Sequence, residues 1–131
     1  MILAGTGIIR GLGPTSVSPL SVVVGNNAGT GLLRNWYSAD ASTWNNASNT
    51  INTTSLGVAW SPTLGLFCSV ASRVFGATCI QISTDGITWT SATTVPTNLL
   101  VWSGITWSPA LGLFCAVGFS GTYSSKAMTS P

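Results

Sequence analysis

Residues 57–70 read Gly-Val-Ala-Trp-Ser-Pro-Thr-Leu-Gly-Leu-Phe-Cys-Ser-Val, and residues 104–117 read Gly-Ile-Thr-Trp-Ser-Pro-Ala-Leu-Gly-Leu-Phe-Cys-Ala-Val. The two segments are identical at most positions and lie 47 residues apart, which indicates an internal repeat. A fainter third copy, with a shorter turn, comprises Val17–Pro19 and Ser21–Gly25. The chain is therefore expected to consist of repeated units.

A second element repeats in phase with the first. Ser83-Thr84-Asp85-Gly86-Ile87-Thr88-Trp89 matches Ser38-Ala39-Asp40-Ala41-Ser42-Thr43-Trp44 at an offset of 45 residues. A further copy starts at Met128–Pro131, and the sequence ends there, one residue before the Asp that this copy would have. The sequence thus predicts a segment over residues 1–16 and nearly three units over 17–131. Their expected boundaries are 17–56, 57–103 and a truncated 104–131.

Each unit has the pattern of β-structure. Short runs rich in Val, Ile, Thr, Phe and Trp alternate with Gly, Pro and Asp-Gly turns, which predicts strands over Val58–Trp60, Phe67–Ala71, Thr78–Ile82 and Thr88–Thr90. Between the first two of these strands, Ser-Pro-x-Leu-Gly is typical of a hairpin loop. Four antiparallel strands in each repeat of about 46–47 residues are typical of one β-propeller blade. The expected fold is all-β, an incomplete propeller with fewer than three complete blades per chain.

The element from Ser83 to Trp89 resembles the Asp-box, or neuraminidase-type, repeat of sialidase-like propellers. The usual form of that motif has one more residue between Asp and Gly. The shorter form, joined to a Trp-Ser-Pro-x-Leu-Gly hairpin, is similar to propeller repeats of phage tail and virion proteins. The resemblance covers about residues 17–131, and it implies that the Asp-boxes lie on the outer rim of a propeller, away from a central ligand pocket.

The two Asp-boxes are expected to be structural turns. The Asp85 carboxylate can accept hydrogen bonds from turn amides, and Gly86 permits the positive φ of a tight Asp-Gly turn. Asp40 occupies the equivalent place in the earlier copy. There Ala41 replaces the glycine, so the pattern does not fix the geometry of that turn.

The aromatic residues fall into two groups. Tryptophans at equivalent places in the repeats are predicted to pack between blades: Trp44, Trp60, Trp89 and Trp107. The aromatic residues outside those places are the candidates for an exposed contact with a ligand such as a glycan: Trp36, Tyr37, Trp102 and Tyr123.

The composition argues against most enzymes. The chain has no His, two acidic residues (both Asp) and only 5% charged residues, although 45% of it is hydrophobic. General acid–base catalysis and His-based metal sites require residues that are missing here. Sialidases of the resembled family use an arginine triad, a tyrosine nucleophile and acidic partners, whereas Arg10, Arg34 and Arg73 occupy no matching motif. We therefore expect no enzyme activity, no cofactor, no catalytic residue and no metal site.

Charge and hydropathy limit the partners. The four cations are spread along the chain and form no basic stripe for nucleic acid. No apolar run approaches the ~18 residues of a membrane-spanning helix, and Met1–Gly13 lacks the pattern of a secretory signal. Cys68 and Cys115, at equivalent repeat positions, are predicted to be small buried hydrophobic residues.

These observations favour a non-enzymatic structural or adhesion protein of a phage particle, such as a tail, fibre or capsid-decorating component. It would assemble in the host cytoplasm and act as a homo-oligomer with other virion proteins, because fewer than three blades cannot close a propeller. One way to complete a blade would be for the N-terminal segment of one chain to pair with the C-terminal unit of another. Two alternatives stay open: a lectin-like module that binds host glycans, with an extracellular location as the alternative to the virion, and a fragment of a larger sialidase-like propeller.

Overall fold

Eleven β-strands and no helix make up the described part of the chain. In this computed structural model, that part comprises residues 9–11, 20–26, 33–48, 54–72, 79–92, 101–120 and 124–130. The expected all-β class is confirmed. None of the three sheets formed by the described strands closes on itself.

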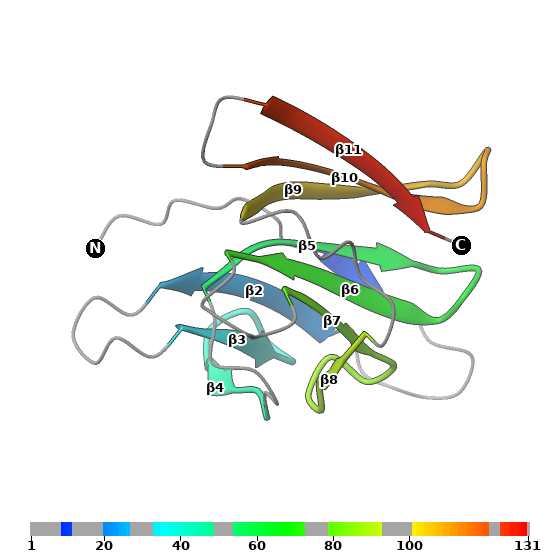
Figure 1. Ribbon diagram of the computed structural model, residues 1–131. Coiled ribbons are helices and arrows are strands. Elements are labelled where there is room, and N and C mark those ends of the chain that lie inside the picture. The colour runs from blue at the N-terminus through cyan, green and yellow to red at the C-terminus, as the bar shows by residue number, and fades with distance from the viewer. Residues whose placement is uncertain are drawn as a thin grey trace.

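The three sheets follow one another along the chain, and each is antiparallel (Figure 1). The first sheet contains β1 (Ile9–Gly11), β2 (Leu20–Asn26), β3 (Leu33–Ser38) and β4 (Asn45–Asn46). The second contains β5 (Ser55–Ser61), β6 (Leu66–Ala71), β7 (Ile80–Ser83) and β8 (Thr90–Ser91). The third contains β9 (Val101–Ser108), β10 (Leu113–Ser120) and β11 (Ser124–Ser130), with β10 in the middle.

The repeat in the sequence is a repeat in strand register. The hairpin of the second sheet closes with Ser61 opposite Leu66, and that of the third closes with Ser108 opposite Leu113. Gly65 and Gly112 adopt positive φ angles of 60° and 66° in these two loops, as a tight turn requires. The four strands expected in the second unit are present, with ends shifted by at most three residues where the expected end is described.

The first unit begins earlier than expected. Gly11 pairs with Leu20 in the same register as the hairpin ends of the other two sheets, so β1 is the first strand of this unit. The sequence analysis predicts that residues 1–16 form a separate segment that could pair with a neighbouring chain, whereas residues 9–11 pair with β2 of the same chain. The difference arises because β1 lacks the tryptophan that marks the equivalent strands β5 and β9.

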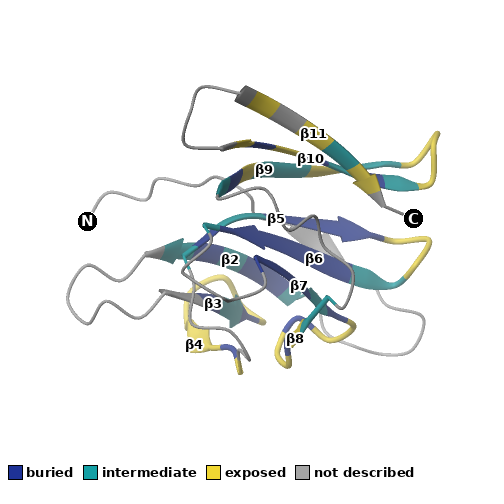
Figure 2. Ribbon diagram, viewed as in Figure 1, coloured by how far each residue is buried: buried dark blue, intermediate teal, exposed yellow. Residues whose placement is uncertain are grey.

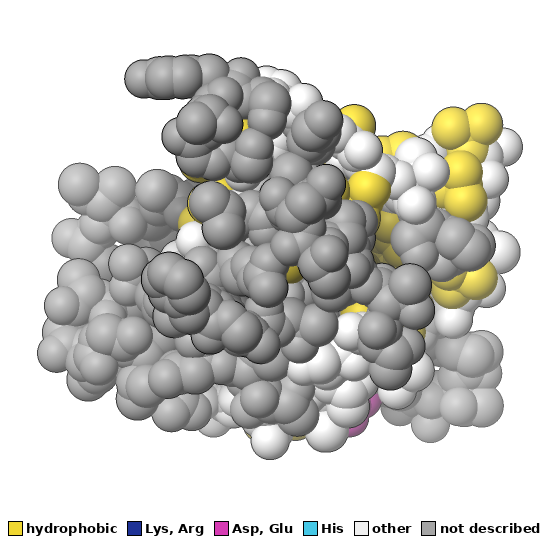
Figure 3. Space-filling view, in the orientation of Figure 1, with side chains coloured by type: hydrophobic (Ala, Val, Ile, Leu, Met, Phe, Trp, Pro, Cys, Tyr) yellow, Lys and Arg dark blue, Asp and Glu magenta, His cyan; other side chains and the backbone are white. Residues whose placement is uncertain are grey.

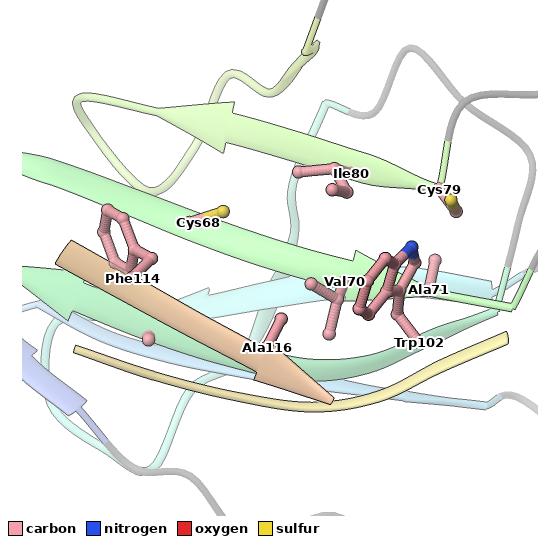
Figure 4. Packing of buried hydrophobic residues seen from close by; sticks show 9 residues of the cluster. Cys68, Val70, Ala71, Cys79, Ile80, Trp102, Phe114 and Ala116 are labelled. Atoms are coloured by element: carbon pink, nitrogen blue, oxygen red, sulfur yellow. The ribbon is translucent and has the colours of Figure 1, made fainter. Parts of the chain in front are cut away.

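The second sheet lies between the other two, and each of its faces is covered (Figure 1). Toward the first sheet, a core of Val58, Trp60, Phe67 and Trp89 packs against Val22, Val24 and Ala47. Toward the third sheet, Cys68, Val70 and Ile80 pack against Trp102, Phe114 and Ala116 (Figure 4). Because side chains alternate between the faces of a strand, neighbouring positions of β6 serve the two different cores.

Burial follows from this order of sheets. The strands β5, β6 and β7 of the second sheet are mainly buried, whereas β10 of the third sheet alternates between buried positions and positions that are half-buried or exposed (Figure 2). The third sheet is covered by the second on one of its faces, and exposed hydrophobic side chains such as Val117 lie on its other face.

Candidate functional site

The Asp85 loop, residues 84–89, follows β7 and is held by hydrogen bonds to one carboxylate oxygen of Asp85. The backbone amides of Ile87 and Thr88 donate to Asp85 Oδ1 at 2.8 and 2.7 Å, and the Ser83 hydroxyl donates to the same atom at 2.9 Å. The Gly86 amide in turn donates to Ser83 Oγ at 2.8 Å. Serine and aspartate therefore close the loop as a reciprocal pair, a common use of short polar side chains in turns.

The Asp40 loop repeats this geometry in the first unit. Asp40 Oδ1 accepts hydrogen bonds from the Ser38 hydroxyl and from the amides of Ser42 and Thr43, at 2.8, 2.8 and 2.7 Å. Ala41 adopts φ 58°, close to the 71° of Gly86, so the two loops have the same left-handed turn. The alanine thus holds a conformation that glycine adopts more readily.

Both carboxylates are stabilised in the charged form. At Asp40 the amides of Thr43 and Ser42 hold the pKa well below its usual value. At Asp85 partial burial acts to raise the pKa, but the hydrogen bonds from Thr88, Ile87 and Ser83 together outweigh it, so this pKa is also lowered. Each aspartate is thus an anion at neutral pH, with one oxygen engaged by its own turn.

The Asp85 loop also joins the first two sheets. Ser48 donates its amide to the carbonyl of Ile87 at 2.8 Å and accepts a hydrogen bond from the Trp89 amide at 2.9 Å. The Trp89 ring is 0% exposed, packs in the core between these sheets and donates its Nε1–H to the Gly86 carbonyl at 3.1 Å. The loop is therefore a joint between two units, as well as a turn within one.

Gly86 fits this joint because it has no side chain. A Cβ at this position would lie 2.6 Å from Leu20 Cδ2 and 2.9 Å from Val22 Cγ2, both in the first sheet. Such distances are shorter than real Cβ contacts, so any other residue would force the Leu20 and Val22 side chains to shift and would also strain the backbone at this positive φ. The sequence identified the need for positive φ here, but the close approach of another unit gave no signal in the motif.

The four tryptophans predicted to pack between units lie in different environments. Trp60 is buried beside Phe67, with ring centroids 4.3 Å apart, and Trp89 is buried in the same core. Trp107 is half-buried against the core between the second and third sheets, and its ring centroid lies 4.9 Å from the ring centroid of Phe114. Trp44 differs from the expectation because it is 38% exposed, in a loop at the outer end of the array.

The four candidates for an exposed ligand contact do not come together as one surface. Trp36 and Tyr37 are adjacent in β3, so they point to opposite faces of the first sheet, and Tyr37 packs against the core there. Trp102 is not exposed, in contrast to the expectation; its ring is buried between the second and third sheets (Figure 4). Tyr123 lies outside the described residues.

Trp102 is buried by the second sheet and lies beside a glycine of its own sheet. This residue pairs with Gly118 of β10, where a Cβ would lie 3.0 Å from the Trp102 ring. A glycine within a strand often marks the close approach of a large neighbour. Gly118 is therefore the signal in the sequence that could have placed Trp102 in the core.

The cysteines and acids do not assemble into a cluster. Cys68 and Cys79 are buried and Cys115 is half-buried, and burial raises the pKa of Cys68 to about 12. Within the described ranges, no three His, Cys, Asp or Glu side chains are grouped so that they could hold a metal ion. In the same part of the chain, no helix is long and apolar enough to span a bilayer. The chemistry that the described site offers is hydrogen bonding within turns and packing between sheets.

Comparisons of the chain with protein-family models, with curated proteins and with solved structures found no match.

Proposed function

We propose that this chain is a non-enzymatic structural or attachment protein of a phage particle, whose three sheets are propeller-type blades. The observation that carries the proposal is the Asp85 loop, because the motif that distinguishes the repeat uses its aspartate to close the turn and its glycine and tryptophan to join one sheet to the next. Because these residues are used for packing between sheets, they favour a structural role over a catalytic one. The resemblance of the shortened Asp-box and its hairpin to repeats of phage tail and virion proteins supplies the biological setting.

The proposal includes partners and a location. The chain would assemble in the host cytoplasm with other virion proteins and with itself, and it would remain in the finished particle. Its low content of charged residues supports this role, because extended contacts between protein surfaces bury uncharged side chains at lower cost than charged ones. The lectin-like alternative receives less support, since Trp102 is buried and Trp36 and Tyr37 face opposite sides of β3.

Particle purification tests the proposal. Gold-labelled antibodies against the chain should bind at one defined part of purified particles of the phage that encodes it, and the protein should remain with the particles through a density gradient. The isolated protein should bind no glycan on an array and release no product from fluorogenic glycosides. Glycan binding that disappears in Trp36→Ala would instead favour the lectin, and absence of the chain from the particles would refute the structural role.

A further inference from the structure

The outer face of the third sheet, defined by Leu113, Cys115, Val117 and Phe119 of β10, is the counterpart of a face that is covered elsewhere in the molecule. Leu113, Cys115 and Val117 are the repeat equivalents of Leu66, Cys68 and Val70 in β6. Those three residues belong to or pack against the core between the second and third sheets. Val70 is 0% exposed and Val117 is 55% exposed, although both are valines in the same register.

The composition of this outer face is that of an interface. Phe119, which is 48% exposed, extends the apolar row at a position where the second sheet has Ser72. In the neighbouring strands, hydroxyl groups and small side chains flank the row on the same face: Val101, Gly104, Thr106, Ser125, Ala127 and Thr129. Figure 3 shows further hydrophobic side chains at the hairpin between β9 and β10, which lies beside this face and does not form part of it. An apolar centre with a polar, uncharged border is typical of surfaces that bind another protein.

The other end of the array is not adapted to cover this face. In the first sheet, Arg10 and Ser21 form the register pair that Trp60 and Phe67 form in the second. Ala41 stands where Gly86 leaves no room for a Cβ against the neighbouring sheet. A second copy added head to tail would therefore lack the aromatic pair of the internal contact and would meet a Cβ where that contact has a glycine.

We propose that the outer face of the third sheet binds the same face of a second copy of this chain, about a two-fold axis. Sheets pack face to face through apolar rows of this kind, and two-fold pairing requires only that one surface complement itself. Within the chain, the equivalent face of each preceding sheet is likewise covered by another sheet, which there contributes its opposite face. The inference rests on the proposed structural role and deepens it by naming one partner and the surface that binds it.

The mass of the isolated chain of 131 residues in solution tests this pairing. Sedimentation equilibrium should give twice the chain mass of 13.4 kDa, and Val117→Asp should give the single-chain mass. Phe119→Ser, which introduces the residue of the second sheet, should weaken association by at least tenfold. Leu111→Asp is the matched control: Leu111 is more exposed than Val117 but lies in the hairpin loop away from the face, so this variant should keep the double mass.

Native cysteines give a second readout, which stays valid if an aspartate variant fails to fold. In the wild-type chain, Cys115 should become slower to label with a maleimide as protein concentration rises, while the buried Cys68 and Cys79 should be slow at every concentration. A single-chain mass at all concentrations would overturn the pairing, and so would masses that grow beyond two copies or dissociation of the Leu111→Asp control. Because no particle is involved, this result can fail independently of the proposed location.

Discussion

The Asp40 loop and the Asp85 loop share a sequence pattern and the same set of carboxylate hydrogen bonds, yet only one of them lies between two sheets. Around Asp85, Gly86 touches the first sheet and Trp89 is completely buried. Around Asp40, Ala41 is exposed and Trp44 is 38% exposed. The comparison teaches that the motif builds its turn by itself, whereas its contribution to packing depends on whether a sheet precedes it.

The largest difference in stability between the two loops should be found on replacing their tryptophans, Trp89 and Trp44. Trp89→Ala should destabilise the protein by about 3–5 kcal/mol, because it removes a fully buried ring and its hydrogen bond to Gly86. Trp44→Ala should cost only about 1 kcal/mol, because part of its ring already faces water. Urea unfolding followed by circular dichroism measures both values. Equal losses for the two variants would contradict the difference in packing.

Substitutions at the two positive-φ positions, Gly86 and Ala41, should change the stability of the protein in opposite directions. Gly86→Ala should cost about 2–4 kcal/mol, because the new methyl group meets Leu20 and Val22 and the backbone conformation becomes strained. Ala41→Gly should have a small effect and should stabilise the folded state by up to about 1 kcal/mol, because it relieves a left-handed alanine. Thermal melts of both single variants measure the contrast. The contact is refuted if Gly86→Ala melts at the wild-type temperature.

Removing the carboxylates should have a smaller effect. Asp85→Ala should lower stability by about 1 kcal/mol, since the turn amides lose their acceptor but can partly turn to water. Asp40→Ala should lower it less, because its loop supports no contact between sheets. The same urea titrations measure both changes, and a larger loss for Asp40→Ala would reverse the assignment of the joint.

Acid should act weakly on both loops and in a predictable direction. The two pKa values are lowered in the folded state, and the unfolded value of Asp is about 3.9. The carboxylates therefore contribute stability above pH of about 4, and this contribution is lost as pH falls through the folded-state pKa values. Melting temperatures recorded from neutral to acidic pH should decline below that point, and the Asp40→Asn/Asp85→Asn double variant should show a flatter profile. A wild-type profile that stays flat in acid would exclude the shifts.

Much of this fold could be predicted because the chain repeats itself. A run such as Trp60-Ser61-Pro62 that recurs with the same spacing marks a strand end and a hairpin, and the turn roles of Asp85 and Gly86 follow from the chemistry of short side chains. What could not be predicted is position within the array. The sequence around Trp44 is similar to that around Trp89, and their burial differs because, among the described residues, a sheet precedes the unit of Trp89 and none precedes the unit of Trp44.

Strand β1 was missed for a related reason. It lacks the tryptophan of β5 and β9, and only its pairing with β2 shows that it belongs to the first unit. Trp102 is a candidate for an exposed contact in the sequence because it lies outside the repeated motifs, although Gly118 opposite it marks a close approach of the two strands. The alternation of apolar and polar residues along a strand indicates which face of the strand is apolar, but it does not indicate which unit covers that face.

Amide hydrogen exchange measured by NMR tests most directly whether the Asp85 loop joins two sheets. The amides of Ser48 and Trp89, which bond across the joint, should exchange as slowly as those in the middle of β6. The amides of Ser42 and Thr43, which bond only to the exposed Asp40 carboxylate, should exchange much faster. If the Ser48 and Trp89 amides exchange as fast as those of Ser42 and Thr43, the two sheets are not joined by this loop and the account fails.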